Sequence, residues 1–97
     1  MDTSKFHDHT GWITAVILGR WCQAKIYNEG SEFGINGGRV SKLVIGKSSE
    51  VVMGGNFFDQ MAYNYDRGLD FDNLPTGVLD DIVGQLEALP KLVISQE

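Results

Sequence analysis

The residues best suited to binding chemistry lie in and after a glycine-rich segment. The segment Gly34–Arg39 reads Gly-Ile-Asn-Gly-Gly-Arg, and Lys42 stands three residues further on. Consecutive backbone amides at positive φ can form a nest that holds an anion. Arg39, Lys42 and the more distant Arg67 would then add charge-assisted hydrogen bonds. The pattern makes an anionic small molecule, such as a nucleotide, one candidate ligand.

The same segment also has a purely structural interpretation, which we favour. It lacks the spacing of a Walker phosphate-binding motif, and no helix is expected directly after it. Asn36-Gly37 is the strongest short turn signal in the chain, because both residues tolerate the positive φ values of a type I′ turn. A hairpin turn with a glycine bulge at Gly38 explains the composition without a ligand.

Clustered carboxylates raise the question of a metal site. Asp66, Asp70 and Asp72 lie close together in the sequence. A calcium loop that began at Asp70 would need a ligand at position 74 and a glycine at position 75, where the chain has Leu and Pro. We therefore interpret this segment as a solvated acidic loop, and we expect neither a metal nor another cofactor.

The residues needed for nucleophilic catalysis are not grouped in the sequence. Catalysis of this kind needs a nucleophile, a base and an orienting group within hydrogen-bond reach. The two histidines, His7 and His9, lie in a polar N-terminal segment, and two histidines are too few for a zinc site. Cys22 alternates with Ala24 and Ile26, which is typical of a buried and inert thiol. We expect a protein that is not an enzyme.

Composition narrows the class of protein further. A chain of 97 residues with 42% apolar and 22% charged residues suits one globular domain, which we place at residues 11–94 between a flexible leader, 1–10, and a tail, 95–97. The net charge of −5 argues against direct binding to nucleic acid. No apolar run is long enough to span a membrane, and no signal peptide is visible. With a single cysteine, these features favour the cytoplasm.

Alternation of apolar and polar residues predicts a series of strands. Residues 12–18 and 21–27 are expected to form a hairpin, with Gly19-Arg20 as a type II′ turn. Further strands are expected at residues 39–45, 51–53 and 61–65, the last with Met61, Tyr63 and Tyr65 on one face.

A helix is expected from Pro75 to Leu89. Its apolar residues form one stripe, and Pro90 ends it. We expect Ile82 and Leu86 in the core, and the three acidic residues Asp80, Asp81 and Glu87 largely in solvent. The predicted fold is α+β: an antiparallel sheet of four to five strands with one C-terminal amphipathic helix packed on one face.

The aromatic residues outnumber those that so small a core can hold. Some are therefore expected on the sheet face opposite the helix, where they would form an interaction surface or stack against a base. Half-buried packing within the sheet is the alternative for Tyr63 and Tyr65. The aromatic residues considered are Trp12, Trp21, Phe33, Phe57, Phe58, Tyr63 and Tyr65.

Two blocks of the sequence, 33–43 and 65–70, resemble a family of small uncharacterised proteins of bacteriophages and integrated mobile elements. That family has a tryptophan in its first strand, a G-I-N-G-G-R-[IV]-S-K-L block and a Y-D-R-G-W-D block. The resemblance covers residues 11–72, and the chain departs from it at Leu69, where the family has Trp, and in a longer segment at 51–60. It implies a phage or prophage origin, with no known activity and no catalytic residue. It singles out four residues that form either a cross-strand ion network or a binding site: Arg39, Lys42, Asp66 and Arg67.

Together these features lead us to expect a phage- or prophage-derived accessory protein that binds and inhibits a host protein, such as a CRISPR-type component of antiviral defence. An acidic inhibitor can occupy a basic nucleic-acid-binding surface on its partner. The alternative is a small-molecule or nucleotide-binding module that uses the Gly34–Arg39 loop. The candidate binding residues are Arg39, Lys42, Tyr63, Tyr65, Asp66, Arg67 and Asp70.

Overall fold

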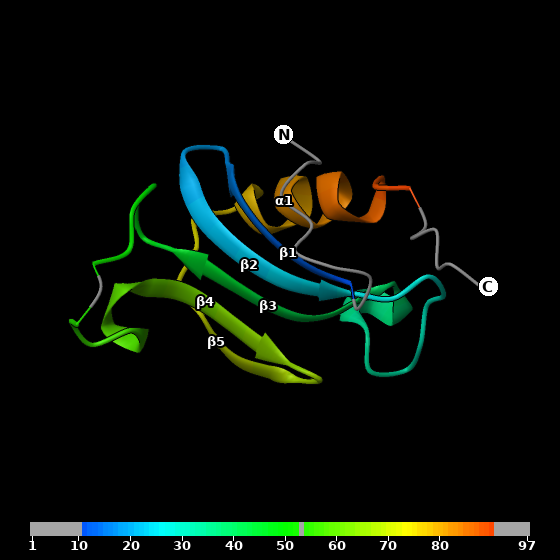
Figure 1. The fold of residues 1–97 in the computed structure, drawn as a ribbon. Coiled ribbons are helices and arrows are strands. Elements are labelled where there is room, and N and C mark those ends of the chain that lie inside the picture. Colours follow the sequence, from blue (N-terminus) through cyan, green and yellow to red (C-terminus); the bar gives the residue numbers. More distant parts are fainter. Residues whose placement is uncertain (1–10, 53, 91–97) are drawn as a thin grey trace.

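The fold is a five-stranded antiparallel sheet with one helix packed on one of its faces (Figure 1). The computed structural model describes residues 11–52 and 54–90. The strand order β1-β2-β3-β4-β5 is the order of the chain, so every strand pairs with its sequence neighbour. This architecture confirms the predicted α+β class. The elements are β1 (Trp12–Ile17), β2 (Arg20–Ile26), the 3-10 turn η2 (Ile35–Gly37), β3 (Val40–Gly46), the 3-10 turn η3 (Phe58–Gln60), β4 (Met61–Asp66), β5 (Leu69–Asp72) and α1 (Val78–Glu87).

The first hairpin forms where the alternation predicted it, but with a different turn. Ile17 pairs with Arg20, so the two turn residues are Leu18 and Gly19. Their φ values are 53° and 73°, both positive as in a type I′ turn. The predicted type II′ turn at Gly19-Arg20 is therefore wrong by one residue, because Arg20 belongs to β2 and completes the ladder.

The core lies between the helix and one face of the sheet. Cross-strand partners share a face, and Ile13, Ala24 and Leu43 occupy one such row, each at most 1% exposed. The next row contains Cys22 and Ile45, which are also buried. Ile82 and Leu86 of α1 belong to the same cluster and cover these rows. Burying this apolar surface is the main force that holds the two layers together.

The helix confirms the predicted stripe and corrects its ends. Ile82 and Leu86 are buried, while Asp80 and Asp81 are exposed. The helix begins at Val78 rather than at Pro75, because Gly77 has a left-handed φ of 87° that a helix interior does not accept. Within the described residues, no helix combines the length and apolar character needed to cross a membrane.

Two segments differ from the predicted strands. Val51 and Val52 are not part of a strand, and Met53 lies outside the described residues. Leu69–Asp72 forms β5, although the segment was predicted to be an acidic loop. Pairing with β4 explains this difference, since the backbone of an edge strand is held by its neighbour while its side chains remain in solvent.

Replacing Ile82 by Ala is expected to lower the free energy of unfolding by about 2–5 kcal/mol, because it leaves a cavity in the core. Gly84→Ala in the same helix is the control: a Cβ there meets no atom within 4 Å, so this variant should gain about 0.5–1 kcal/mol. Urea unfolding followed by circular dichroism measures both. Equal stability of the two variants would contradict the placement of the helix.

Candidate functional site

The glycine-rich segment does hold an anion, and that anion belongs to the protein itself. The carboxylate oxygen Oε2 of Glu87 accepts hydrogen bonds from the backbone N–H groups of Arg39, at 2.7 Å, and Val40, at 3.2 Å. A Cβ added at Gly38 would collide with this carboxylate. Glycine at position 38 therefore lets the helix side chain reach the start of β3. The prediction that Glu87 is largely solvent-facing was wrong.

The Arg39 side chain also links the start of β3 to the end of α1, here as a hydrogen-bond donor to the helix. Its Nη1 donates to the carbonyl oxygens of Glu87, at 3.0 Å, and Leu89, at 2.6 Å. Its Nε donates to the carbonyl oxygen of Tyr27 at 2.8 Å. The last carbonyl groups of a helix lack partners inside the helix, and a cation there also interacts favourably with the helix dipole. Arg39 thus caps α1.

These contacts change the meaning of the predicted anion nest. Asn36 and Gly37 have φ values of 55° and 74°, and Gly38 N–H donates to Ile35 O at 2.9 Å, as the predicted turn requires. The turn lies in the β2–β3 loop and is not a two-residue hairpin turn. The amides of Gly34, Gly37, Gly38 and Arg39 already donate hydrogen bonds within the protein, which weakens the case for a nucleotide at this loop.

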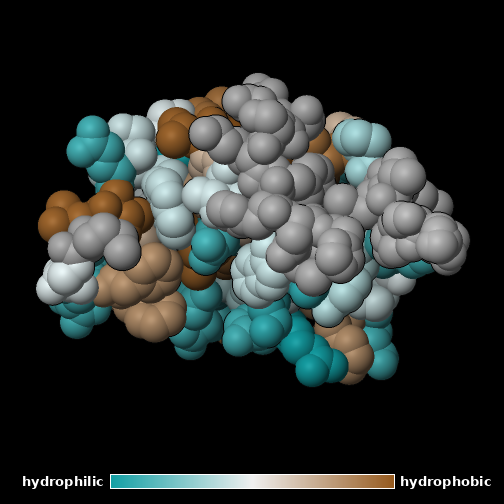
Figure 2. All heavy atoms as spheres, in the orientation of Figure 1, coloured by the Kyte–Doolittle hydropathy of each residue, from teal (hydrophilic) through white to brown (hydrophobic). Residues whose placement is uncertain are grey.

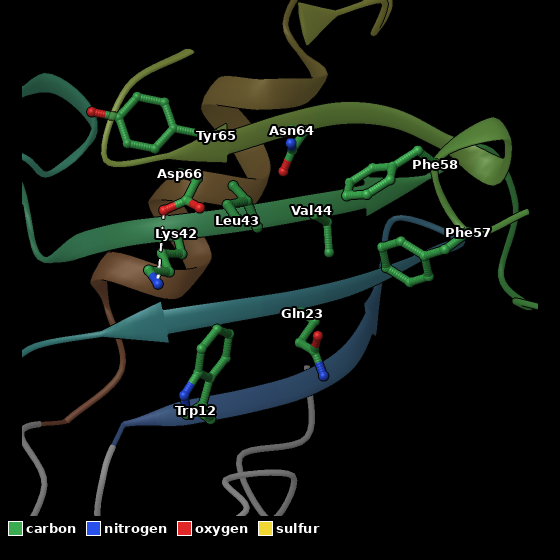
Figure 3. A pocket seen from close by; sticks show the side chains of 10 residues that line it. All are labelled: Trp12, Gln23, Lys42, Leu43, Val44, Phe57, Phe58, Asn64, Tyr65 and Asp66. Atoms are coloured by element: carbon green, nitrogen blue, oxygen red, sulfur yellow. Dashed lines mark ion pairs between the residues drawn. The ribbon is translucent and has the colours of Figure 1, made fainter. Parts of the chain in front are cut away.

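The sheet face away from the helix carries a shallow depression of about 230 Å³ (Figure 3). Val44 lies on its floor, with Gln23 and Asn64 as its cross-strand neighbours. Phe57 and Phe58 stand at one end, and Trp12 stands on the side of β1. The residues that line it are Trp12, Gln23, Lys42, Leu43, Val44, Phe57, Phe58, Asn64, Tyr65 and Asp66.

One end of this face is strongly apolar. The rings of Trp21 and Phe57 meet edge to face with centroids 5.8 Å apart, and Phe57 meets Phe58 in the same way at 5.2 Å. Val52 and Phe58 are more than half exposed. Figure 2 shows hydrophobic surface at this end, over the connection between β3 and β4. Exposed apolar residues gathered in this way are typical of an interaction surface.

The charged candidates lie beside the depression. Lys42 and Asp66 are cross-strand partners with a nitrogen–oxygen distance of 3.7 Å; Asp66 is exposed and Lys42 is partly exposed. Asp70 is exposed and accepts a hydrogen bond from Asn64 Nδ2 at 3.0 Å. Arg67 lies over the ring of Phe33, 4.1 Å from its centroid. The expected ion network is thus a single Lys42–Asp66 pair among the residues that the structure describes.

The two tyrosines differ in position: Tyr63 belongs to the core cluster, whereas Tyr65 is partly buried against this cluster and also lines the depression. Tyr63 pairs with Ile45 and is 1% exposed, so it is a core residue that no partner can reach. Burial raises the pKa of its phenol to about 12. Tyr65 pairs with Leu43, and its hydroxyl donates to Phe33 O at 2.9 Å. Met61 is buried but does not belong to the core cluster. It pairs with Gly46, and the register between β3 and β4 shifts between Ile45 and Gly46.

The remaining candidates for chemistry are the metal-ligating side chains and the single cysteine. No cluster of three or more metal-ligating side chains occurs in 11–52 and 54–90. His7 and His9 lie outside the described residues. Cys22 is buried, and its burial raises the thiol pKa from 9.0 to about 12, which leaves it unreactive near neutral pH.

These features define a small two-layer α+β domain, an antiparallel meander with a helix on one face and an aromatic depression on the other. Residues 11–86 match the model of the family described as a domain of unknown function, DUF7678, and the chain belongs to this family. No curated protein and no solved structure matches the chain.

Glu87→Gln is expected to destabilise the protein by about 1.5–3 kcal/mol, because it weakens two hydrogen bonds to a charged acceptor. Glu50→Gln, at an exposed position after β3, is the matched control and should leave the stability unchanged. Thermal unfolding of the three proteins measures the difference. If the two variants melted together, the Glu87 carboxylate would not hold the helix to the sheet.

The Cys22 thiol is expected to react with an aromatic disulfide reagent far more slowly in the folded protein than in urea, at about pH 8. The raised pKa also predicts how stability depends on pH. Below the ordinary value of 9.0 both states are protonated, whereas between 9 and about 12 the unfolded thiol ionises first, so this group lowers stability as the pH rises. Cys22→Ser should remove this part of the alkaline loss. Rapid labelling of the native protein would contradict the burial.

Proposed function

We propose that this protein is a non-catalytic binding protein whose helix-free sheet face contacts another protein. The observation that carries the proposal is the aromatic depression. Phe57 and Phe58 stand at the end of an apolar strip, and Val44 forms the floor beside them. Protein interfaces are enriched in aromatic residues at their centre and carry a polar rim. Lys42 and Asp66 would contribute to that rim.

The charges around the face favour a basic partner. The two lysines on this side are already engaged, because Lys25 lies 5.5 Å from the ring centroid of Trp12 and Lys42 is paired with Asp66. Asp59, beside Phe58, and Asp70 are exposed carboxylates. Opposite charges on the partner would speed encounter and fix the orientation of the complex.

The biological role that we propose is inhibition of a host protein by a phage- or prophage-derived protein. The partner would be a component of antiviral defence, such as a CRISPR effector, whose basic nucleic-acid-binding surface suits the acidic rim. The phage resemblance of the 33–43 and 65–70 blocks supports this role. The rival, a nucleotide held by Gly34–Arg39, has less support because Glu87 and Arg39 already occupy that loop with internal hydrogen bonds.

The proposal predicts that expressing the protein in a host with active CRISPR immunity will restore plating of a targeted phage, and that the purified protein will bind the effector. Phe58→Asp, at a residue 54% exposed, should weaken binding by about tenfold or more, since it places a charge in the apolar part of the interface. Leu69→Asp, 61% exposed on β5, is the matched control and should bind normally. Plating that stays low, or equal loss in both variants, would overturn the proposal.

A further inference from the structure

A second cavity, separate from the aromatic end of the sheet, lies where the β2–β3 loop meets the turn between β4 and β5. It has a volume of about 440 Å³, which falls within the range of small-molecule sites. It is lined by Tyr27, Glu29, Ser31 and Phe33 of the loop, by Ser41 and Lys42 of β3, and by Arg67 of the turn. Elements far apart in the sequence thus converge on one hollow.

The charged residues that line this cavity are Arg67, Lys42 and the carboxylate Glu29, and the backbone holds Arg67 in place. Arg67 has a left-handed φ of 59°, and its N–H donates to Ser41 O at 2.8 Å. Its guanidinium stacks over Phe33, which leaves the N–H groups in the guanidinium plane able to bind an anion. Among the described residues Lys42 forms an ion pair and Arg67 forms none. Arg67 is therefore a cation that is held by its backbone and forms no ion pair within residues 11–52 and 54–90.

The buried hydroxyl of Ser41 is the second, independent observation. Ser41 is 3% exposed, and its Oγ has no hydrogen-bond partner among residues 11–52 and 54–90. Buried hydroxyl groups without a partner are rare in proteins, because they lose the bonds that water would give them. Rotation about χ1 of Ser41 toward a ligand therefore breaks no hydrogen bond to the described residues.

We propose that this cavity binds a mononucleotide. The phosphate accepts hydrogen bonds from Arg67 and, in exchange for its ion pair with Asp66, from Lys42, and the Ser41 hydroxyl donates to it once the ligand has entered. The base stacks on the face of the Tyr27 ring that Lys25 does not cover; Tyr27 is 49% exposed. The site does not use the Gly34–Arg39 loop and does not depend on a protein partner.

The test is calorimetric titration of the isolated protein with AMP, GMP, CMP and UMP, with inorganic phosphate and adenosine as probes of the two halves. At least one mononucleotide should bind, more tightly than phosphate alone, and adenosine should bind weakly or not at all. No binding by any mononucleotide would overturn the site. Phosphate that binds as tightly as the nucleotides would overturn the role of the base.

Three variants connect the binding to these residues. Arg67→Asn removes the charge but tolerates the left-handed φ, and should weaken binding about tenfold or more. Ser41→Ala should weaken binding severalfold without lowering the melting temperature, because its hydroxyl has no partner in the free protein. Lys47→Asn, an exposed lysine outside the cavity, is the charge-matched control and should bind normally. A Ser41→Ala variant that melts lower and binds nucleotide as the parent does would overturn the assignment.

Discussion

The connection between the end of α1 and the start of β3 is the constraint on which the two-layer arrangement depends. The Glu87 carboxylate accepts hydrogen bonds from the backbone N–H groups of Arg39 and Val40, at the start of β3. The Arg39 side chain in turn donates to carbonyl oxygens at the end of the helix. Each residue thus satisfies orphan groups of the other element. Hydrophobic burial brings the layers together without direction, whereas these bonds set where the helix lies along the sheet.

The glycine-rich loop follows from this constraint. Gly38 has no side chain, which lets the Glu87 carboxylate approach its backbone. A Cβ at Gly34 would collide with the backbone of Gly38. The loop is therefore folded tightly onto itself and onto the helix end. What resembles a ligand-binding motif in the sequence is a motif that binds a side chain 48 residues away.

Local patterns predicted the elements that depend on local chemistry. Alternation identified the first hairpin, and the 3.6-residue period placed Ile82 and Leu86 in the core. Long-range contacts escaped prediction for a physical reason: β5 exists because β4 pairs with it, and Glu87 is half-buried because β3 lies beside it. Of the candidate site residues, Lys42, Tyr65 and Asp66 do line one depression. Tyr63 and Arg39 have structural partners that only the tertiary fold reveals.

The order of the strands has a consequence for synthesis on the ribosome. Because each strand pairs with its predecessor, the sheet can grow as the chain emerges, and its last strand ends at Asp72. The helix that covers the apolar rows comes afterwards, at Val78–Glu87. During that interval the nascent sheet exposes Leu43, Ile45 and their neighbours to water, a state in which chains are prone to aggregate. These apolar rows therefore stay exposed until the residues that form α1 have also left the ribosome and folded onto the sheet.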